Sequence, residues 1–477
     1  MSNDRPSFQP PLAAALHHTL RYLSPASTNP VAAPASLETL RSQLGSSLAD
    51  DGVDPTQVIE ELVQAVEGGL NDSAGPRFFG WVIGGSLPAA LAADWLTSAW
   101  DQNAAMYSCA PAASVVEETV GAWLKDLLQL PAAASFSLVT GCQMAHVTCL
   151  AAARHALLAR LQWDVELEGL AGSPPIRILT STEYHGTTAR AIRLLGLGEK
   201  HMIKLPTDSE GRLRVDALQQ ALESAPQAPT IVVLQAGDLN IGAFDDFATL
   251  IPIAKRFGAW VHIDGAFGLW AAASARLRPL LKGADAADSW ATDGHKWLDV
   301  PYDCGYAFVA DRNAHRAALS HRAAYIDPNE GARDQIDWNP EWSRRARGFA
   351  TYAALRQLGR RGVAELIERT CAHAHALVTR IGALEGAEVL WTAQINQGLV
   401  RFIDPRPGAS ATDSDAYTDR IITEILASGV AFFSGTTWHG RRAMRVSVCN
   451  WQTSAEDVDL VVACVAGILR AAKRSSD

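Results

Sequence analysis

The stretch S-W-A-T-D-G-H-K-W-L-D-V-P-Y-D-C-G (289–305) places Lys296 inside an apolar segment that leads into a strand-like run at 304–310. The chain has 34 arginines but only 7 lysines, so a lysine beside Trp and Leu is unusual here. A buried lysine can act as a nucleophile and form a Schiff base. For an isolated lysine, the alternative is a stem that lies along the protein with its ammonium in solvent. The neighbouring segments of the sequence are needed to distinguish a nucleophilic lysine from a solvated one.

On both sides of this stretch, strand-like and helix-like segments alternate. Strands are expected at 136–139, 176–180, 230–235 and 259–264, and helices at about 145–160, 187–195 and 246–257. This alternation predicts an α/β fold in which helices flank a large, mixed, mostly parallel sheet.

A different pattern follows residue 339. It consists of a long helical stretch at 344–385, short strands at 399–403 and 443–449, and a last helix near 456–473. A chain of 477 residues is also too long for one compact domain. We therefore expect an N-terminal helical segment at 1–75, a large α/β domain at 76–340, and a small C-terminal α+β domain at 341–477.

Ligands of α/β sheets bind beyond the carboxyl ends of the strands. One segment there is T-G-C-Q-M-A-H (140–146), which opens a helix. Unpaired N–H groups and a partial positive charge make a helix N-terminus suitable for a phosphate. The alternative is an ordinary turn between a strand and a helix.

Two more strand ends carry polar side chains. His185 lies in E-Y-H-G-T-T (183–188), where a lone histidine is more often a capping or core residue than a ligand. Asp264 ends the apolar strand of V-H-I-D-G-A-F-G (261–268), and a carboxylate there is costly unless it is paired. Ala266 lies two residues on, so the pair would suit a flat aromatic cation, although Asp264 alone could simply cap the next turn.

Together these segments are more specific than any one of them. Pyridoxal 5′-phosphate (PLP) needs a phosphate cradle, a carboxylate at its pyridine nitrogen, packing on both ring faces, and a lysine at its aldehyde carbon. The expected α/β domain contains candidates for all four.

The same residues give the chain a resemblance to a known family. It resembles the group II PLP-dependent amino acid decarboxylases, which include aromatic L-amino acid, glutamate and 2,4-diaminobutyrate decarboxylases. The most specific match is H-K-W with a following D-C-G, and the V-H-I-D-G-A and H-x-x-x-x-R-A patterns match as well. Asp264 lies 79 residues after His185 and 32 before Lys296, a spacing that also fits the family.

The resemblance implies the aspartate aminotransferase fold (fold type I) and a role for each matching residue. Lys296 would form the Schiff base, and Asp264 would keep the pyridine nitrogen protonated. His185 and Ala266 would pack on the two ring faces, and His295 would lie near the phosphate or the substrate. The remaining implied ligands are Gly141, Cys142 and Gln143 for the phosphate, and Asn240 for the PLP hydroxyl.

Substrate contacts are suggested at two positions. In fold type I transaminases, an arginine at the place of Arg445 binds the substrate carboxylate; the alternative here is a surface salt bridge. Trp81 and Trp270 could line an aromatic pocket, although tryptophans are more often core residues. The sequence does not choose between aromatic, acidic and diamino substrates.

The chain also departs from the family pattern. Gln143 and Met144 stand where a small hydroxyl residue and an acidic residue are usual. Asp293 replaces a frequent asparagine near the phosphate, and we expect it to point elsewhere because a carboxylate would repel the phosphate. When aligned back from Arg344–Arg345, Gln335 stands near the place of the loop tyrosine that reprotonates the substrate carbon, and Tyr325 is interpreted as structural.

Composition excludes several other classes. The formal net charge is −10 and no basic stripe is present, so nucleic acid is not an expected partner. The seven cysteines include no C-x-x-C pair, which indicates free thiols in a reducing compartment and no metal site. No secretory signal and no stretch of about 20 apolar residues are recognisable, so we expect a cytoplasmic protein without a membrane span.

The leading hypothesis is therefore PLP-dependent decarboxylation of an L-amino acid, in a homodimer whose N-terminal helices pack across the interface. A second hypothesis is other PLP chemistry on the same scaffold: transamination, oxidative deamination to an aldehyde, or carbon–carbon lyase chemistry. A third is a PLP-binding protein without catalysis.

Overall fold

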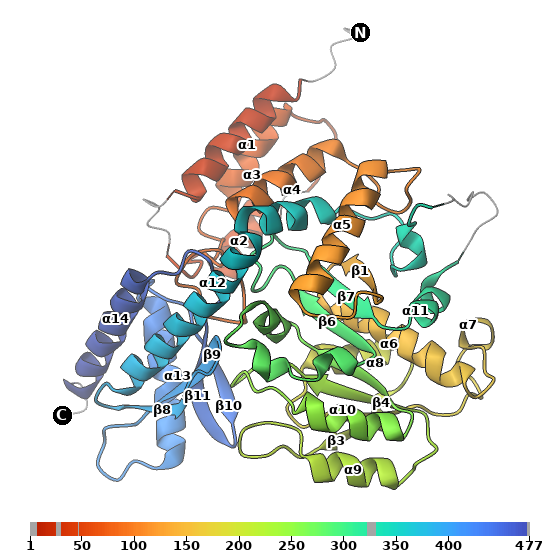
Figure 1. Cartoon of the computed structure of the whole chain (residues 1–477). Coiled ribbons are helices and arrows are strands. Elements are labelled where there is room, and N and C mark those ends of the chain that lie inside the picture. The colour runs from red at the N-terminus through yellow and green to blue at the C-terminus, as the bar shows by residue number, and fades with distance from the viewer. Residues whose placement is uncertain (1–6, 25–29, 46, 322–330, 475–477) are drawn as a thin grey trace.

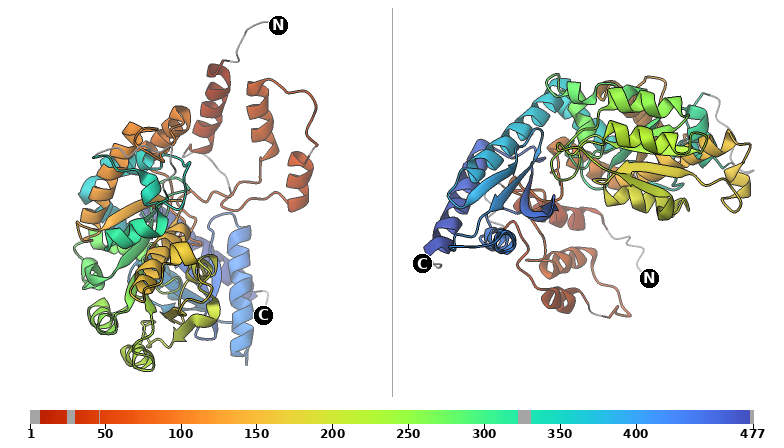
Figure 2. Two further views of the ribbon diagram at one scale, coloured as in Figure 1. Left: turned by 90° about the vertical axis from the view of Figure 1, so that its right-hand side faces the viewer. Right: turned by 90° about the horizontal axis from the view of Figure 1, so that it is seen from below.

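The computed structural model describes residues 7–24, 30–45, 47–321 and 331–474. The chain begins with three helices, α1 (Gln9–Tyr22), α2 (Leu37–Leu44) and α3 (Pro55–Ala65), which project from the main body (Figure 2). Side-chain caps start two of them: Ser36 accepts from the N–H of Thr39, and Asp54 accepts from the N–H groups of Thr56 and Gln57. None of the three helices contains a buried residue.

A seven-stranded sheet forms the centre of the molecule (Figure 1). Its strands are β1 (Ser135–Val139), β2 (Arg177–Ser181), β3 (Met202–Leu205), β4 (Thr230–Gln235), β5 (Trp260–Asp264), β6 (Ser289–Asp293) and β7 (Gly305–Val309). They lie in the order β1-β7-β6-β5-β4-β2-β3, and only β7 runs antiparallel to its neighbours. The prediction of a mostly parallel sheet is confirmed.

Apolar clusters cover both faces of this sheet. One cluster includes Leu124, Leu218 and Leu250 from helices on one face, and another includes Leu157 and Ile192 from helices on the other. The helices are α4 (Pro88–Trp100), α5 (Pro111–Leu127), α6 (Cys142–Ala159), α7 (Val165–Glu168), α8 (Gly186–Leu194), α9 (Val215–Glu223), α10 (Phe247–Arg256) and α11 (Arg312–Leu319). Short 3-10 turns lie at η1 (Glu199–His201), η2 (Gly268–Ala273), η3 (Arg278–Leu281), η4 (Ala284–Ala286) and η5 (Gln335–Asp337).

A second, smaller sheet lies toward the C-terminus. Its strands β8 (Ala387–Trp391), β9 (Gln397–Phe402), β10 (Ser434–Trp438) and β11 (Arg441–Ser447) are antiparallel, in the order β10-β11-β9-β8. Helices α13 (Ala411–Ala427) and α14 (Ala455–Arg474) complete this part.

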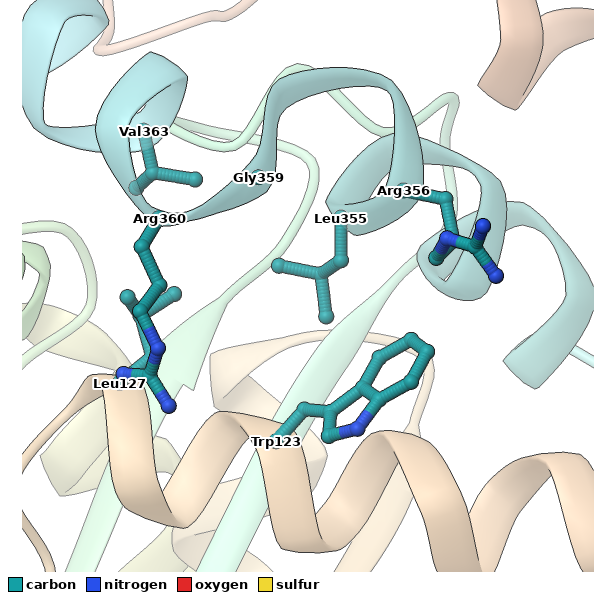
Figure 3. Close-up of a pocket in the computed structure, with 7 residues that line it drawn as sticks. All are labelled: Trp123, Leu127, Leu355, Arg356, Gly359, Arg360 and Val363. Carbon is teal, nitrogen blue, oxygen red and sulfur yellow. The ribbon is translucent and has the colours of Figure 1, made fainter.

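The long helix α12 (Gly348–Gly382) contacts α4 and α5 at its start and the small sheet toward its end. It was expected to be continuous, but Gly359 has a φ of 62° and interrupts it. A pocket lies beside this interruption (Figure 3), lined by Trp123, Leu127, Leu355, Arg356, Gly359, Arg360 and Val363.

Among the described residues, no helix combines the length and apolar character that a membrane span requires.

Candidate active site

The N-terminus of helix α6 forms one wall of the site. Its first residue, Cys142, donates its backbone N–H to Asp293 Oδ1 at 2.5 Å. Gly141 precedes the helix at a point of close approach, because a Cβ there would lie 3.0 Å from His295 Cε1. Gln143 Nε2 donates to the carbonyl of Thr187 at 3.3 Å, which ties α6 to α8.

The orientation of Asp293, at the end of β6, differs from the prediction. The side chain was expected to point away from this wall, but its Oδ1 accepts from Cys142 and lies 3.4 Å from His295 Nε2, and its Oδ2 lies 3.0 Å from Lys296 Nζ. The helix N-terminus and the ammonium both attract a carboxylate. These two attractions oppose the repulsion between Asp293 and a phosphate on which the expectation was based.

Lys296 follows the end of β6 by three residues, and its side chain is 19% exposed. Burial alone would lower its pKa, but Asp293 first, then Cys142 and Asp264, raise the pKa of Lys296 above its usual value. The ammonium is therefore charged in the free protein, with Asp293 as its counterion. The alternative of a solvated ammonium is wrong.

Asp264 ends strand β5 and is almost fully buried. Burial would raise its pKa, but His146, His185 and Lys296 together hold the pKa of Asp264 well below its usual range. The carboxyl is thus an anion. Oδ1 accepts from the N–H of Ala266 at 3.2 Å, which places the small Ala266 side chain directly after the carboxylate.

Two further histidines border the site. His185 caps helix α8: its Nδ1 accepts from the N–H of Thr187 at 3.3 Å and lies 2.7 Å from the Thr187 hydroxyl. Burial lowers the pKa of His185, which favours the neutral ring. His295 Nδ1 accepts from the N–H of Cys304 at 3.1 Å, and its ring stacks on Tyr302 with centroids 4.3 Å apart.

Arg445, on β11, is 4% exposed, so the alternative of a surface salt bridge is wrong. Its Nη1 donates to the carbonyl of Leu239 at 3.4 Å. Among the described residues, its Nε has no hydrogen-bond partner and no carboxylate pairs with its guanidinium. Burial lowers the pKa of Arg445 to about 10, still above neutral pH. Arg445 is therefore a buried cation that no described carboxylate contacts directly, although the charge of Asp238 acts on it from a distance.

The other predicted residues have diverse surroundings. Asn240 Oδ1 accepts from the Thr436 hydroxyl at 2.7 Å, so its amide contacts the small sheet. Trp81 is 54% exposed and lies beside Phe432, with ring centroids 4.8 Å apart. Trp270 is fully buried and donates its Nε1 to the carbonyl of Asp293 at 2.9 Å, so it is a core residue.

Gln335 lies in the buried turn η5, where Arg333 donates to its Oε1. It is 1% exposed, and the next residue, Ile336, bonds to the carbonyl of Ala105. A carboxamide held in this way is no acid for a substrate carbon. Tyr325 lies outside the described residues.

Sequence reasoning missed two histidines. His146 Nε2 lies 3.5 Å from Asp264 Oδ2, and His146 Nδ1 lies 2.9 Å from His262 Nε2. Both rings are fully buried. The available signal was a histidine on each of two otherwise apolar segments, T-G-C-Q-M-A-H and V-H-I-D. The thiol of Cys142 joins His146 and Asp264 in a group whose potential ligand atoms lie within 4.8 Å of one another.

The residues present fit PLP. The N-terminus of α6 presents backbone N–H groups to an anion, and one of them, that of Cys142, already binds the carboxylate of Asp293. Asp264 is a buried anion that suits a cation such as a protonated pyridine, and Lys296 is a partly buried lysine close enough to lower the pKa of Asp264. The absence of a Cβ at Gly141 leaves room beside His295.

Comparisons with known proteins agree with this chemistry. The model of the pyridoxal-dependent decarboxylase conserved domain matches residues 38–403. Aromatic-L-amino-acid decarboxylase of Bacillus atrophaeus is 26% identical and covers 90% of this chain and 89% of its own length. L-2,4-diaminobutyrate decarboxylase of Rhizobium meliloti (strain 1021) is 28% identical, over 78% of this chain and 74% of its own.

Among solved structures, Oryza sativa TDC with PLP and tryptamine superposes with a TM-score of 0.88 at 23% identity, over 96% of this chain and 97% of that one. That likeness shows the fold, and the family match extends over most of the chain. The chain therefore belongs to the pyridoxal-dependent decarboxylase family, and it is a carboxy-lyase that uses PLP to decarboxylate an amino acid.

Proposed function

We propose that Lys296 is the residue that binds PLP covalently, that Asp264 faces the pyridine nitrogen, and that an L-amino acid is decarboxylated there. One observation carries this assignment. A partly buried ammonium just after β6 and a buried carboxylate at the end of the adjacent strand β5 lie beside the N-terminus of α6.

When bound, PLP supplies an electron sink for the bond that breaks at the substrate's α-carbon. Asp264, held as an anion, keeps a proton on the pyridine nitrogen. Asp293 Oδ2, 3.0 Å from Lys296 Nζ, is the nearest acceptor for the proton that this lysine must lose before its amine can act as a nucleophile.

The other cofactor contacts are assigned from where the remaining residues lie around Lys296 and Asp264. We assign the phosphate to the backbone N–H groups of Gly141, Cys142 and Gln143, with His295 beside it; the N–H of Cys142 would exchange Asp293 for the phosphate. His185 and Ala266 would pack on the two faces of the ring. Asn240 is assigned to the hydroxyl of PLP, although its amide also bonds Thr436.

Arg445 is the candidate ligand for the substrate carboxylate. It is buried, no described carboxylate forms an ion pair with it, and a guanidinium can bind a carboxylate through two parallel hydrogen bonds. It lies close enough to the site to contribute, after burial, to the lowered pKa of His185. Trp81 is retained as a second substrate contact because its half-exposed ring is free to meet a ligand or a partner subunit.

We also propose a cytoplasmic homodimer, with the N-terminal helical segment at its interface and domain boundaries near residues 75 and 340. Along α1, Leu12, Leu16 and Leu20 recur every four residues and are 57%, 47% and 61% exposed. Such a stripe faces a partner in most proteins. Trp95 and Trp100 of α4 are exposed as well, which extends the apolar surface onto the large domain.

The test is mass spectrometry of the products after PLP-loaded protein is incubated in air with a panel of L-amino acids. Amine with CO2 identifies the substrate class and supports the assignment. Aldehyde or oxo acid as the main product would contradict it, and no product from any substrate would favour a PLP-binding protein without catalysis.

The same assay can locate the acid that returns a proton to the substrate carbon. Tyr325→Phe and Gln335→Leu are compared by the ratio of aldehyde to amine. We expect Gln335→Leu to leave that ratio unchanged, because a buried carboxamide has no acidic proton. A rise in aldehyde for Tyr325→Phe alone would assign the step to the phenol of Tyr325.

A further inference from the structure

Cys142, His146 and Asp264 form a compact group of potential metal ligands beside the N-terminus of α6. Cys142 Sγ lies 3.4 Å from His146 Nε2 and 3.9 Å from Asp264 Oδ1, and His146 Nε2 lies 3.5 Å from Asp264 Oδ2. With one ligand atom from each residue, all three atoms lie within 4.8 Å of one another. All three residues are buried. The function proposed above uses the carboxylate and the backbone of Cys142, but neither the thiol nor the imidazole.

Two of the three side chains come from one face of one helix. Cys142 and His146 are four residues apart in α6, so their side chains lie one turn apart on the same face. The same spacing brings the two histidines of an H-E-x-x-H helix to one zinc ion. The absence of a C-x-x-C pair predicted no metal site, but here the third ligand comes from strand β5, 122 residues after Cys142.

The separations between the ligand atoms suit a small thiophilic cation. A tetrahedral zinc ion, with bonds of about 2.3 Å to sulfur and about 2.0–2.2 Å to nitrogen and oxygen, sets its ligand atoms about 3.3–3.6 Å apart. The three distances above lie within about 0.3 Å of that range. A sulfur and a nitrogen ligand favour zinc over Mg²⁺ or Ca²⁺, which prefer oxygen. Three protein ligands leave the fourth position of the ion for water.

The charges around the thiol also favour a cation. The charged side chains that act most strongly on Cys142 are Asp264, Asp293 and Lys296. Two carboxylates and one ammonium have a net charge of −1. A Zn²⁺ ion with a cysteine thiolate adds a charge of +1, so the occupied group would be neutral.

The imidazole of His146 is supported from behind. Its Nδ1 lies 2.9 Å from His262 Nε2, and both rings are fully buried. A ligating histidine commonly forms such a bond through its second nitrogen, which fixes the orientation of the ring. Metal binding displaces any proton from Nε2 of His146 and from the thiol, so the site does not depend on where these protons lie in the free protein.

We propose that Cys142, His146 and Asp264 bind one Zn²⁺ ion in the protein without PLP, and that zinc and the cofactor exclude each other. One carboxylate cannot serve a metal ion and a protonated pyridine at once, and the two cations repel each other. Zinc therefore slows the loading of PLP. This exclusion rests on the function proposed above for Asp264, whereas metal binding by itself does not.

The test titrates the full-length protein, freed of PLP with hydroxylamine, with Co²⁺ as a spectroscopic probe. We expect one cobalt ion per chain, a thiolate-to-cobalt charge-transfer band in the near ultraviolet, and the visible bands of four-coordinate cobalt. Zn²⁺ should displace the cobalt, because zinc binds such ligands more tightly. Addition of PLP should remove the cobalt bands, and one equivalent of Zn²⁺ should slow the appearance of the visible absorption of bound PLP.

Two substitutions locate the ligands. Cys142→Ser changes a single atom and should abolish the charge-transfer band. His146→Asn should weaken zinc binding, measured by competition with a chelating dye, by at least about a hundredfold, since loss of an outer-shell partner alone costs about tenfold to a hundredfold. If His146→Asn does not fold, His262→Phe removes that outer-shell partner and should weaken zinc binding by about tenfold to a hundredfold.

Cys149→Ser is the matched control. Cys149 is buried in the same helix, seven residues after Cys142, but its thiol bonds the carbonyls of Trp290 and Phe308 at 3.5 and 3.6 Å. This variant should keep both the cobalt bands and the affinity for zinc.

The proposal is overturned if the unmodified protein without PLP shows no charge-transfer band, if Cys142→Ser keeps that band, or if PLP-loaded protein binds cobalt as tightly as PLP-free protein. The function proposed for Asp264 fails separately. It is refuted if Asp264→Asn retains full turnover and an unchanged cofactor spectrum.

Discussion

Helix α1 exposes apolar side chains that proteins usually bury, whereas the carboxyl edge of the large sheet buries charged side chains that proteins usually expose. Helix α1 leaves three leucines at least 47% exposed, whereas the sheet edge buries Asp264 and Asp293 to 6% and 2% exposure. Exposed apolar surface and buried charge are both costly for a single chain in water. The first supports the proposed contact with a partner, and the second supports the proposed ligand site.

Among the substitutions at the sheet edge, Lys296→Ala should cause the largest loss of activity. Without this amine the covalent attachment of PLP is lost, and we expect turnover to fall by at least about a thousandfold. Visible absorbance and product formation measure the effect. Lys255→Ala is the control, because Lys255 pairs with Asp288 at the surface and should leave activity unchanged. Comparable activity in both variants would place the chemistry elsewhere.

Arg445→Met tests whether the unpaired cation is a ligand site. Loss of a charge-assisted hydrogen bond to the substrate should raise KM about tenfold to a hundredfold. Thermal stability of the free protein should not fall, because the substitution removes a buried cation that forms no ion pair with a described carboxylate.

Arg401→Met on the adjacent strand β9 is the matched control for Arg445. Arg401 is 5% exposed but donates to Asp415 at 2.8 Å and to the carbonyl of Ala411 at 2.7 Å. We expect it to lose stability by about 1 kcal/mol or more with KM unchanged. A reversed pattern in the two variants would make Arg445 a structural residue.

The exposed stripe of α1 is tested by the double substitution Leu16→Glu, Leu20→Glu. If a second copy covers the stripe, each leucine contributes about 2 kcal/mol of apolar burial, and the dimer should dissociate at micromolar concentration. Light scattering after size exclusion measures the mass. His17→Glu adds a charge at another exposed position of the same helix and should leave the dimer intact. An unmodified protein that is monomeric and fully active would refute the interface.

The last prediction concerns a buried carboxyl that serves structure rather than a ligand, and it should leave activity unchanged. Asp299 accepts the N–H groups of Gly85 and Trp451, and burial raises its pKa to about 8. In the unfolded chain its pKa is about 3.9, so its stabilising contribution is complete below about pH 4 and is lost as the pH rises toward 8. The free energy of unfolding of Asp299→Asn, relative to that of the unmodified protein, should therefore rise by up to about 1.4 kcal/mol per pH unit between pH 5 and 8.

Thermal midpoints of both proteins at pH 5 and pH 8 measure this difference. A difference that is independent of pH would show that Asp299 does not titrate in that range. Activity at a fixed pH should be equal in the two proteins, which separates this buried carboxyl from Asp264.

Much of this arrangement could be predicted from the sequence. Alternating apolar segments predict the parallel sheet, and polar residues at the ends of such segments predict where Lys296, Asp264 and His185 lie. These signals are local: they depend on the residue type and on its place after a strand. Strand β6 was missed as a strand because its five residues, S-W-A-T-D, carry three polar side chains.

The rest depends on contacts between distant segments. The direction of Asp293 is set by Cys142, which is 151 residues away in the chain, and by a lysine whose charge was not weighed against the phosphate. The pair of His146 and His262 joins a helix to a strand 116 residues further on. Counting back from an arginine pair placed Gln335 in a loop, whereas Arg333 and the turn η5 bury it.

The most direct measurement locates the cofactor on the chain. PLP-loaded protein is reduced with borohydride, digested and examined by mass spectrometry for a pyridoxyl adduct, which is decisive in a chain with only seven lysines. The account predicts a single adduct, on Lys296. An adduct on any other lysine, or none in protein that has bound PLP and is active, would contradict it.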